Sequence, residues 1–178
     1  RARVAGQRPA RPAAQLRQSV LRLAAADPEQ MRVLGARLGA AICAAGVEPA
    51  IVIGLTGELG AGKTTLVAGL LAGLGHEGPV RSPTYTLIEP YRLAGRYLYH
   101  CDLYRLRDPA ELDDLGLRDL AVERSVLLVE WPERAGDRLG KPDLLLQIEY
   151  APPGRAVEAN ASSDAGRQVL AALRLDPA

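Results

Sequence analysis

The chain has 178 residues, of which 48% are hydrophobic and 24% charged, and its formal net charge at pH 7 is +1. This length and composition predict one globular domain with a sizeable core. The near-neutral charge gives no general argument for a nucleic-acid or membrane surface, and the absence of any run of eighteen apolar residues argues against a membrane-spanning helix.

The cysteines and histidines do not indicate a metal site. Cys43 and Cys101 lie far apart and, together with His76 and His100, form no metal-ligand spacing. We interpret each cysteine as a small buried hydrophobe in a reducing compartment.

The first residues differ in composition from the rest. Residues 1–17 are rich in Arg, Ala, Pro and Gln without periodicity, which predicts a disordered extension. A solvated tail is favoured over an RNA-binding one, and the segment lacks the apolar stretch of a secretory signal. Residues 18–178 are interpreted as one folded domain.

The first elements of that domain are marked by local signals. Residues 20–23 are a candidate edge strand. Asp27 then provides a helix N-cap with Pro28 at the first helical position, and the predicted helix runs to about Ala45. The apolar run at residues 51–55 predicts a buried strand.

The segment at residues 57–64 reads Gly-Glu-Leu-Gly-Ala-Gly-Lys-Thr and matches G-x-x-x-x-G-K-[ST], the P-loop. It lies between the buried strand and a predicted helix from Thr65 to about Leu74, which is the context that this motif requires. Backbone N–H groups of such a loop wrap around nucleotide phosphates. Lys63 places a positive charge against the β- and γ-phosphates, and the Thr64 hydroxyl is a hard oxygen ligand for Mg²⁺.

The second half of the chain mixes strands and helices. Two antiparallel strands are expected at residues 84–91 and 96–103, followed by a helix that Asp108 and Pro109 open. A buried strand is expected at 126–129. The chain then forms a closing hairpin at 144–150 and 155–161 and a last helix at 164–173, capped by Ser163. The predicted fold class is α/β: a three-layer P-loop fold with a mixed, mostly parallel central sheet and antiparallel hairpins.

Two carboxylates are placed to assist the P-loop. Glu130 directly follows the buried strand at 126–129, and Asp102 follows the strand before it. Ligands of α/β sheets bind beyond the carboxyl ends of the strands, so both are candidates to act near Mg²⁺. The segment Ser82–Thr86 is a candidate switch that senses the γ-phosphate, although a proline-containing turn explains its spacing equally well.

These blocks together resemble the TsaE family, the P-loop ATPase subunit of bacterial tRNA threonylcarbamoyladenosine biosynthesis. The resemblance covers residues 20–175 and is carried by the P-loop and by three further blocks at residues 82–91, 100–106 and 129–134. The S-P-T-Y-T-L and V-E-W-P segments within them are together quite specific, whereas the P-loop alone is widespread.

The resemblance implies a cytoplasmic, Mg²⁺-dependent ATPase. The family member hydrolyses ATP at a two-paralogue transferase complex of TsaB and TsaD type, which modifies the adenosine beside the tRNA anticodon, and it meets tRNA only indirectly. At matching positions, the resemblance implies that Lys63, Asp102 and Glu130 are catalytic and that Thr64 and Glu130 bind Mg²⁺. The implied ATP contacts are Glu58, Leu59, Gly60, Ala61, Gly62, Lys63, Thr64, Thr65, Thr84, Asp27, Pro28, Gly154 and Arg155, with Trp131 as the neighbouring aromatic.

Three other functions also use a P-loop. A GTPase would need an N-K-x-D element, and the single asparagine, Asn160, is followed by Ala-Ser-Ser. A small-molecule or nucleotide kinase of the P-loop class stays open, because residues 104–124 contain four arginines that suit a lid: Arg105, Arg107, Arg118 and Arg124. A module that binds ATP without hydrolysing it would carry the same P-loop.

Overall fold

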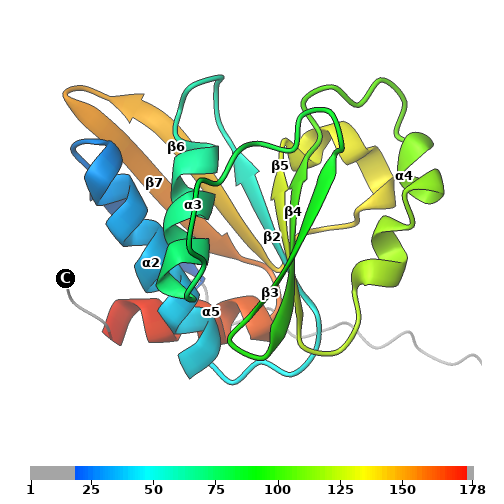
Figure 1. Ribbon diagram of the computed structural model, residues 1–178. Coiled ribbons are helices and arrows are strands. Elements are labelled where there is room, and N and C mark those ends of the chain that lie inside the picture. Colours follow the sequence, from blue (N-terminus) through cyan, green and yellow to red (C-terminus); the bar gives the residue numbers. More distant parts are fainter. Residues whose placement is uncertain (1–18, 176–178) are drawn as a thin grey trace, which may run out of the picture.

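The computed structural model describes residues 19–175 and contains one seven-stranded sheet with helices on both faces (Figure 1). The strand order is β1-β7-β6-β2-β5-β4-β3. The strands are β1 (Val20–Ala25), β2 (Ile51–Thr56), β3 (Ile88–Leu93), β4 (Arg96–Asp102), β5 (Ser125–Glu130), β6 (Leu144–Ala151) and β7 (Gly154–Ala161). Strands β6, β2, β5 and β4 run parallel in the centre, and antiparallel pairs close both edges.

The central strand β5 shows why the sheet has two covered faces. Each of its residues is buried. Side chains alternate along a strand, so Val126 and Leu128 pack into the larger core while Leu127 and Val129 pack into the smaller one on the opposite face. A continuous apolar strand is typical of a parallel sheet that is covered on both sides.

The larger core lies under three helices, α2 (Pro28–Ala44), α3 (Lys63–Gly73) and α5 (Asp164–Leu175). The opposite face carries the short α4 (Glu111–Asp114) and two 3₁₀ segments, η1 (Leu117–Leu120) and η2 (Pro132–Arg138). Figure 1 shows these two groups on either side of the sheet. Among the described residues, 19–175, no helix combines the length and apolarity that a membrane crossing needs.

The predicted caps at Asp27 and Ser163 are confirmed, whereas the helix expected to open at Asp108 begins at Glu111 with Ala110 as its N-cap. The Asp27 side chain accepts a hydrogen bond from the Gln30 N–H at 2.8 Å, and Pro28 stands in the first turn of α2. Ser163 Oγ accepts from the Gly166 N–H at the start of α5. The mixed sheet, its parallel centre and both hairpins also agree with the predicted fold class.

Three expectations need correction, and one lies outside the described residues. The strand expected from Thr84 begins at Ile88, because the Leu87 N–H bonds the Pro83 carbonyl and closes a turn. The helix after Pro109 is only four residues long, since Gly116 takes a left-handed conformation and ends it. Cys43 is exposed, whereas Cys101 is buried as expected. The predicted disorder of residues 1–17 falls outside the part of the chain that is described.

Glycine makes close packing between α2 and α3 possible. A Cβ added at Gly69 would overlap the Arg32 carbonyl oxygen and lie 2.6 Å from the Arg32 Cα. Gly69→Ala should therefore lower the free energy of unfolding by about 2 kcal/mol or more, although alanine is the better helix former. Urea denaturation checks this, with Val33→Ala on the exposed face of α2 as a control expected to stay within about 0.5 kcal/mol. An equally stable Gly69→Ala protein would contradict the packing argument.

Candidate nucleotide site

The P-loop connects the buried strand β2 to α3 at the carboxyl edge of the parallel strands. Three of its glycines, Gly57, Gly60 and Gly62, have φ of +141°, +78° and +112°, where other residues are strained. A Cβ at Gly57 would also overlap the Ile148 carbonyl oxygen of β6. The loop therefore leads directly into the first turn of α3, whose N–H groups have no partner within the helix and suit an anion.

Lys63 is 4% exposed and lies at the inner wall of this loop. Its Nζ donates to the Gly57 carbonyl at 2.7 Å and to the Glu58 carbonyl at 2.9 Å, and it stands 3.9 Å from the centre of the Trp131 ring. Burial lowers the pKa of Lys63 below its ordinary value, while the carboxylates of Glu130, Glu133 and Asp102 act in the opposite direction. The ammonium is thus held in a poorly solvated site, where contacts with phosphate oxygens are strong.

Glu130 reaches the same place from β5. It pairs in register with Leu55 of β2 on one side and with Asp102 of β4 on the other. Glu130 is 3% exposed, and its Oε1 accepts a hydrogen bond from Thr64 Oγ1 at 2.8 Å. The strand ends therefore bring a carboxylate against the hydroxyl that begins α3.

Asp102 ties the candidate switch segment to the sheet. Its Oδ2 accepts hydrogen bonds from Ser82 Oγ and, at 3.3 Å, from Thr84 Oγ1, and its Oδ1 accepts from the Tyr104 N–H at 3.0 Å. Asp102 is 4% exposed. The hydroxyls of the segment are consequently held at the end of β4, next to Glu130.

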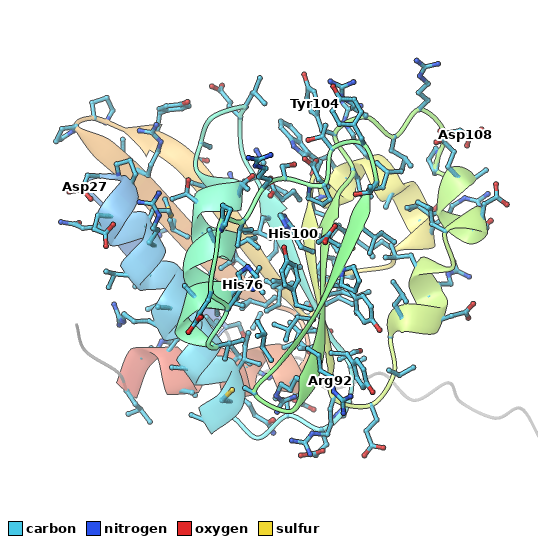
Figure 2. All side chains as sticks on the ribbon, viewed as in Figure 1. Asp27, His76, Arg92, His100, Tyr104 and Asp108 are labelled. Carbon is cyan, nitrogen blue, oxygen red and sulfur yellow. The ribbon has the colours of Figure 1, made fainter. Side chains whose placement is uncertain are left out.

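These groups line one cavity of about 420 Å³. Its walls come from the P-loop, the switch segment and the residues that follow β4 and β5; they are Leu59, Gly60, Gly62, Lys63, Thr64, Thr65, Ser82, Thr84, Asp102, Tyr104, Arg105, Glu130 and Trp131. Figure 2 shows the labelled Tyr104 at the upper end of the sheet, where these strands finish.

A second cavity of about 210 Å³ adjoins the first and shares Gly60, Gly62 and Thr65 with it. It lies between the start of α2 and the turn of the β6–β7 hairpin, and is lined by Ala25, Ala26, Asp27, Pro28, Met31, Gly60, Ala61, Gly62, Thr65, Pro153, Gly154 and Arg155. Figure 2 shows Asp27 at the upper end of α2, the same end of the molecule as Tyr104.

The β6–β7 hairpin also braces the P-loop. Arg155 Nε donates to the Ala61 carbonyl at 3.2 Å, and the Arg155 guanidinium stacks 3.9 Å from the Tyr150 ring centre. The Tyr150 hydroxyl donates to the Leu59 carbonyl at 3.3 Å. Two residues from a distant hairpin therefore hold two carbonyls of the loop, those of Leu59 and Ala61.

The structure gathers nearly all of the residues predicted for the site. Thirteen of the positions named from the sequence line one or both cavities: Asp27, Pro28, Leu59, Gly60, Ala61, Gly62, Lys63, Thr64, Thr65, Thr84, Gly154 and Arg155 among the ATP contacts, with Trp131 as the aromatic. The carboxylates Asp102 and Glu130 line the larger one. Glu58 lines neither, and it joins the site only through its carbonyl, which accepts from Lys63.

Sequence reasoning missed the roles of His100 and Tyr150. His100 Nε2 lies 2.8 Å from Glu130 Oε1, and Tyr150 braces the loop as described above. For His100 a signal was present: it precedes Asp102 by two residues on one strand, so the two side chains share a face. Tyr150 offered no comparable signal.

The donor set fits magnesium bound together with phosphates. Mg²⁺ prefers oxygen ligands, keeps several waters and uses one or two protein oxygens. Thr64 Oγ1 and Glu130 supply such oxygens beside Lys63. Within residues 19–175 no group of three or more His, Cys, Asp or Glu side chains is arranged to hold a metal ion, as a dedicated protein-only metal site would require.

Comparisons with known proteins agree on one family. A family model described as "Threonylcarbamoyl adenosine biosynthesis protein TsaE" matches residues 25–157. The Haemophilus influenzae protein named "tRNA threonylcarbamoyladenosine biosynthesis protein TsaE" is 47% identical over 126 residues, covering 71% of this chain and 80% of that protein. A Bacillus subtilis protein of the same name is 38% identical over 125 residues, covering 70% of this chain and 75% of that protein.

A solved structure extends the comparison to the fold. The crystal structure of Bacillus subtilis YdiB matches with a TM-score of 0.66 and 29% sequence identity, covering 88% of this chain and 95% of that one. The two chains therefore share a fold over most of their length.

Proposed function

The chain belongs to the TsaE family, and from that premise we propose that it binds and hydrolyses Mg²⁺·ATP as a cytoplasmic subunit required for threonylcarbamoyladenosine formation on tRNA. In this proposal it acts on a partner complex of TsaB- and TsaD-type subunits, which transfers the threonylcarbamoyl group to the adenosine next to the anticodon. The chain itself does not carry out the transfer.

The observation that carries the proposal is the convergence of Lys63, Thr64 and Glu130 in one cavity. A cation, a hydroxyl and a carboxylate at the start of a helix are the groups that phosphoryl-transfer sites use to hold phosphates and their metal. In this role Lys63 holds phosphate oxygens, and Thr64 with Glu130 holds Mg²⁺ directly or through water. The bound metal would neutralise charge on the phosphates.

Asp102 and Thr84 are proposed to link the nucleotide to the switch segment. Thr84 lines the larger cavity, which is the phosphate cavity of this proposal, and is hydrogen-bonded to Asp102. A γ-phosphate that attracts the Thr84 hydroxyl would compete with this bond. The segment from Ser82 to Tyr91 can then report which nucleotide is present, as phosphate-sensing loops do.

The smaller cavity supports a place for the nucleoside. It continues the phosphate cavity and offers apolar surface from Pro28, Met31 and Ala61 to a flat base. Asp27, Gly154 and Arg155 supply polar groups at its rim.

The kinase alternative receives less support. Of the four arginines that suggested a lid, only Arg105 lines the phosphate cavity. Arg118 donates to the Arg138 carbonyl at 3.1 Å, and Arg124 pairs with Glu48 at 3.6 Å, so both are engaged away from it. Stimulation of phosphate release by partner proteins, and by no small-molecule acceptor, separates the two functions.

Gel filtration with purified TsaB- and TsaD-type subunits tests the proposed partnership. We expect the chain to co-elute with them when ATP is present and to dissociate with ADP or without nucleotide, because the switch segment responds to the γ-phosphate. Lys63→Ala should remove this nucleotide dependence. The isolated chain should bind tRNA weakly or not at all, since its net charge is only +1. Association with the partner subunits that does not depend on the nucleotide would contradict the proposal, and so would tight binding of tRNA by the chain alone.

A further inference from the structure

His100 is labelled in Figure 2 between α3 and the strands of the sheet. It belongs to β4, is fully buried and does not line either nucleotide cavity. Its Nε2 is 2.8 Å from Glu130 Oε1. The contact joins two neighbouring strands, because His100 pairs in register with Leu128, two residues before Glu130.

The chemistry of this contact decides which nitrogen carries the proton. An ionised carboxylate only accepts hydrogen bonds, so Nε2 must donate. Nδ1 is buried and has no hydrogen-bond partner among the described residues. The contact with Glu130 Oε1 therefore requires a ring hydrogen on Nε2.

The bond completes a pair of donors on one carboxylate oxygen. Thr64 Oγ1 and His100 Nε2 both bond to Oε1 of Glu130, each at 2.8 Å. One donor comes from α3 and the other from β4, so together they restrict rotation of the carboxylate. Neither bond uses Oε2. If the Thr64 oxygen were engaged by a metal, His100 would remain as the donor that holds the Glu130 carboxylate in place.

We propose that His100 is a positioning residue for Glu130: its Nε2–H holds the carboxylate in the orientation that binds Mg²⁺. This inference rests on the proposed function, in which Glu130 acts on the metal. Hydrogen bonds to metal-binding side chains typically contribute 10- to 100-fold to metal affinity. His100 would supply that contribution without touching the metal or the nucleotide.

Two substitutions of similar polarity separate positioning from simple filling of the core. A glutamine amide nitrogen can occupy the place of Nε2, whereas an asparagine amide nitrogen ends near the place of Nδ1. We expect His100→Gln to keep the affinity of the protein·ADP complex for Mn²⁺, a spectroscopic substitute for Mg²⁺, within about threefold, and His100→Asn to lower it by about 10-fold or more. Electron paramagnetic resonance of free Mn²⁺ measures this without turnover, and ADP affinity in EDTA should be unchanged in both variants.

The comparison with Glu130→Gln distinguishes an error in the proposed metal role of Glu130 from an error in the proposed positioning role of His100. If Glu130→Gln leaves Mn²⁺ affinity unchanged, the metal role of Glu130 in the proposed function is wrong. If Glu130→Gln weakens it and His100→Asn does not, the inference about His100 is wrong. Equal losses of Mn²⁺ affinity in His100→Gln and His100→Asn, together with equal losses of thermal stability, would also overturn it, because the ring would then serve only to fill the core.

Discussion

Lys63→Ala should lower the affinity for Mg²⁺·ATP by about 10-fold or more and hydrolysis by about 10²-fold or more. The ammonium is almost completely buried, at the point where the P-loop enters α3. A charge in such a place is weakly screened by water, so its contact with phosphate oxygens is much stronger than at the surface. Fluorescent nucleotide titration and a phosphate-release assay measure both effects.

The chain offers a close control for this substitution. It contains two lysines, and the second, Lys141, is exposed and lines neither nucleotide cavity. Lys141→Ala should leave binding and hydrolysis unchanged. Both variants should retain the far-ultraviolet circular dichroism of the parent, because neither lysine belongs to a hydrophobic core. Unchanged ATP affinity and turnover in a folded Lys63→Ala protein would refute the role of Lys63.

Glu130→Gln should preserve nucleotide binding while hydrolysis falls by about 10²-fold or more. The amide keeps the size of the side chain and an oxygen that can accept from Thr64, so the core around β5 is maintained. Only the negative charge is lost. That charge matters because Mg²⁺ has few protein ligands, and a neutral amide oxygen is a weaker one than a carboxylate. Steady-state hydrolysis across a range of Mg²⁺ concentrations measures the effect.

Glu133→Gln is the matched control. The charge of Glu133, like that of Glu130, acts to raise the pKa of Lys63, but Glu133 is exposed and lines neither cavity. Its substitution should change hydrolysis by less than about threefold, since exposed charges are screened. Near-parental hydrolysis by Glu130→Gln at saturating Mg²⁺·ATP would rule out the assigned role of Glu130, whatever the control shows.

Much of the fold and of the candidate site could be read directly from local sequence. The P-loop, the Asp27 cap of α2 and the apolar strand before Glu130 depend on residues within a few positions of one another, where hydrogen-bond geometry and side-chain alternation act without the rest of the chain. The strand ends also placed Asp102 and Glu130 correctly, because parallel strands finish at one edge of a sheet.

The rest of the fold and of the candidate site depends on contacts between distant segments of the chain. Thr84 and Ser82 are held at the site because Asp102, eighteen and twenty residues later, accepts hydrogen bonds from their hydroxyls. His100 reaches Glu130 only because β4 and β5 pair in one register, and Arg155 braces Ala61 from 94 residues away. Sequence by itself determined which residues are candidates to hold a nucleotide, through local backbone and side-chain chemistry. Tertiary structure decided which groups orient them, since a hydrogen bond between remote side chains exists only once the sheet has set their distance.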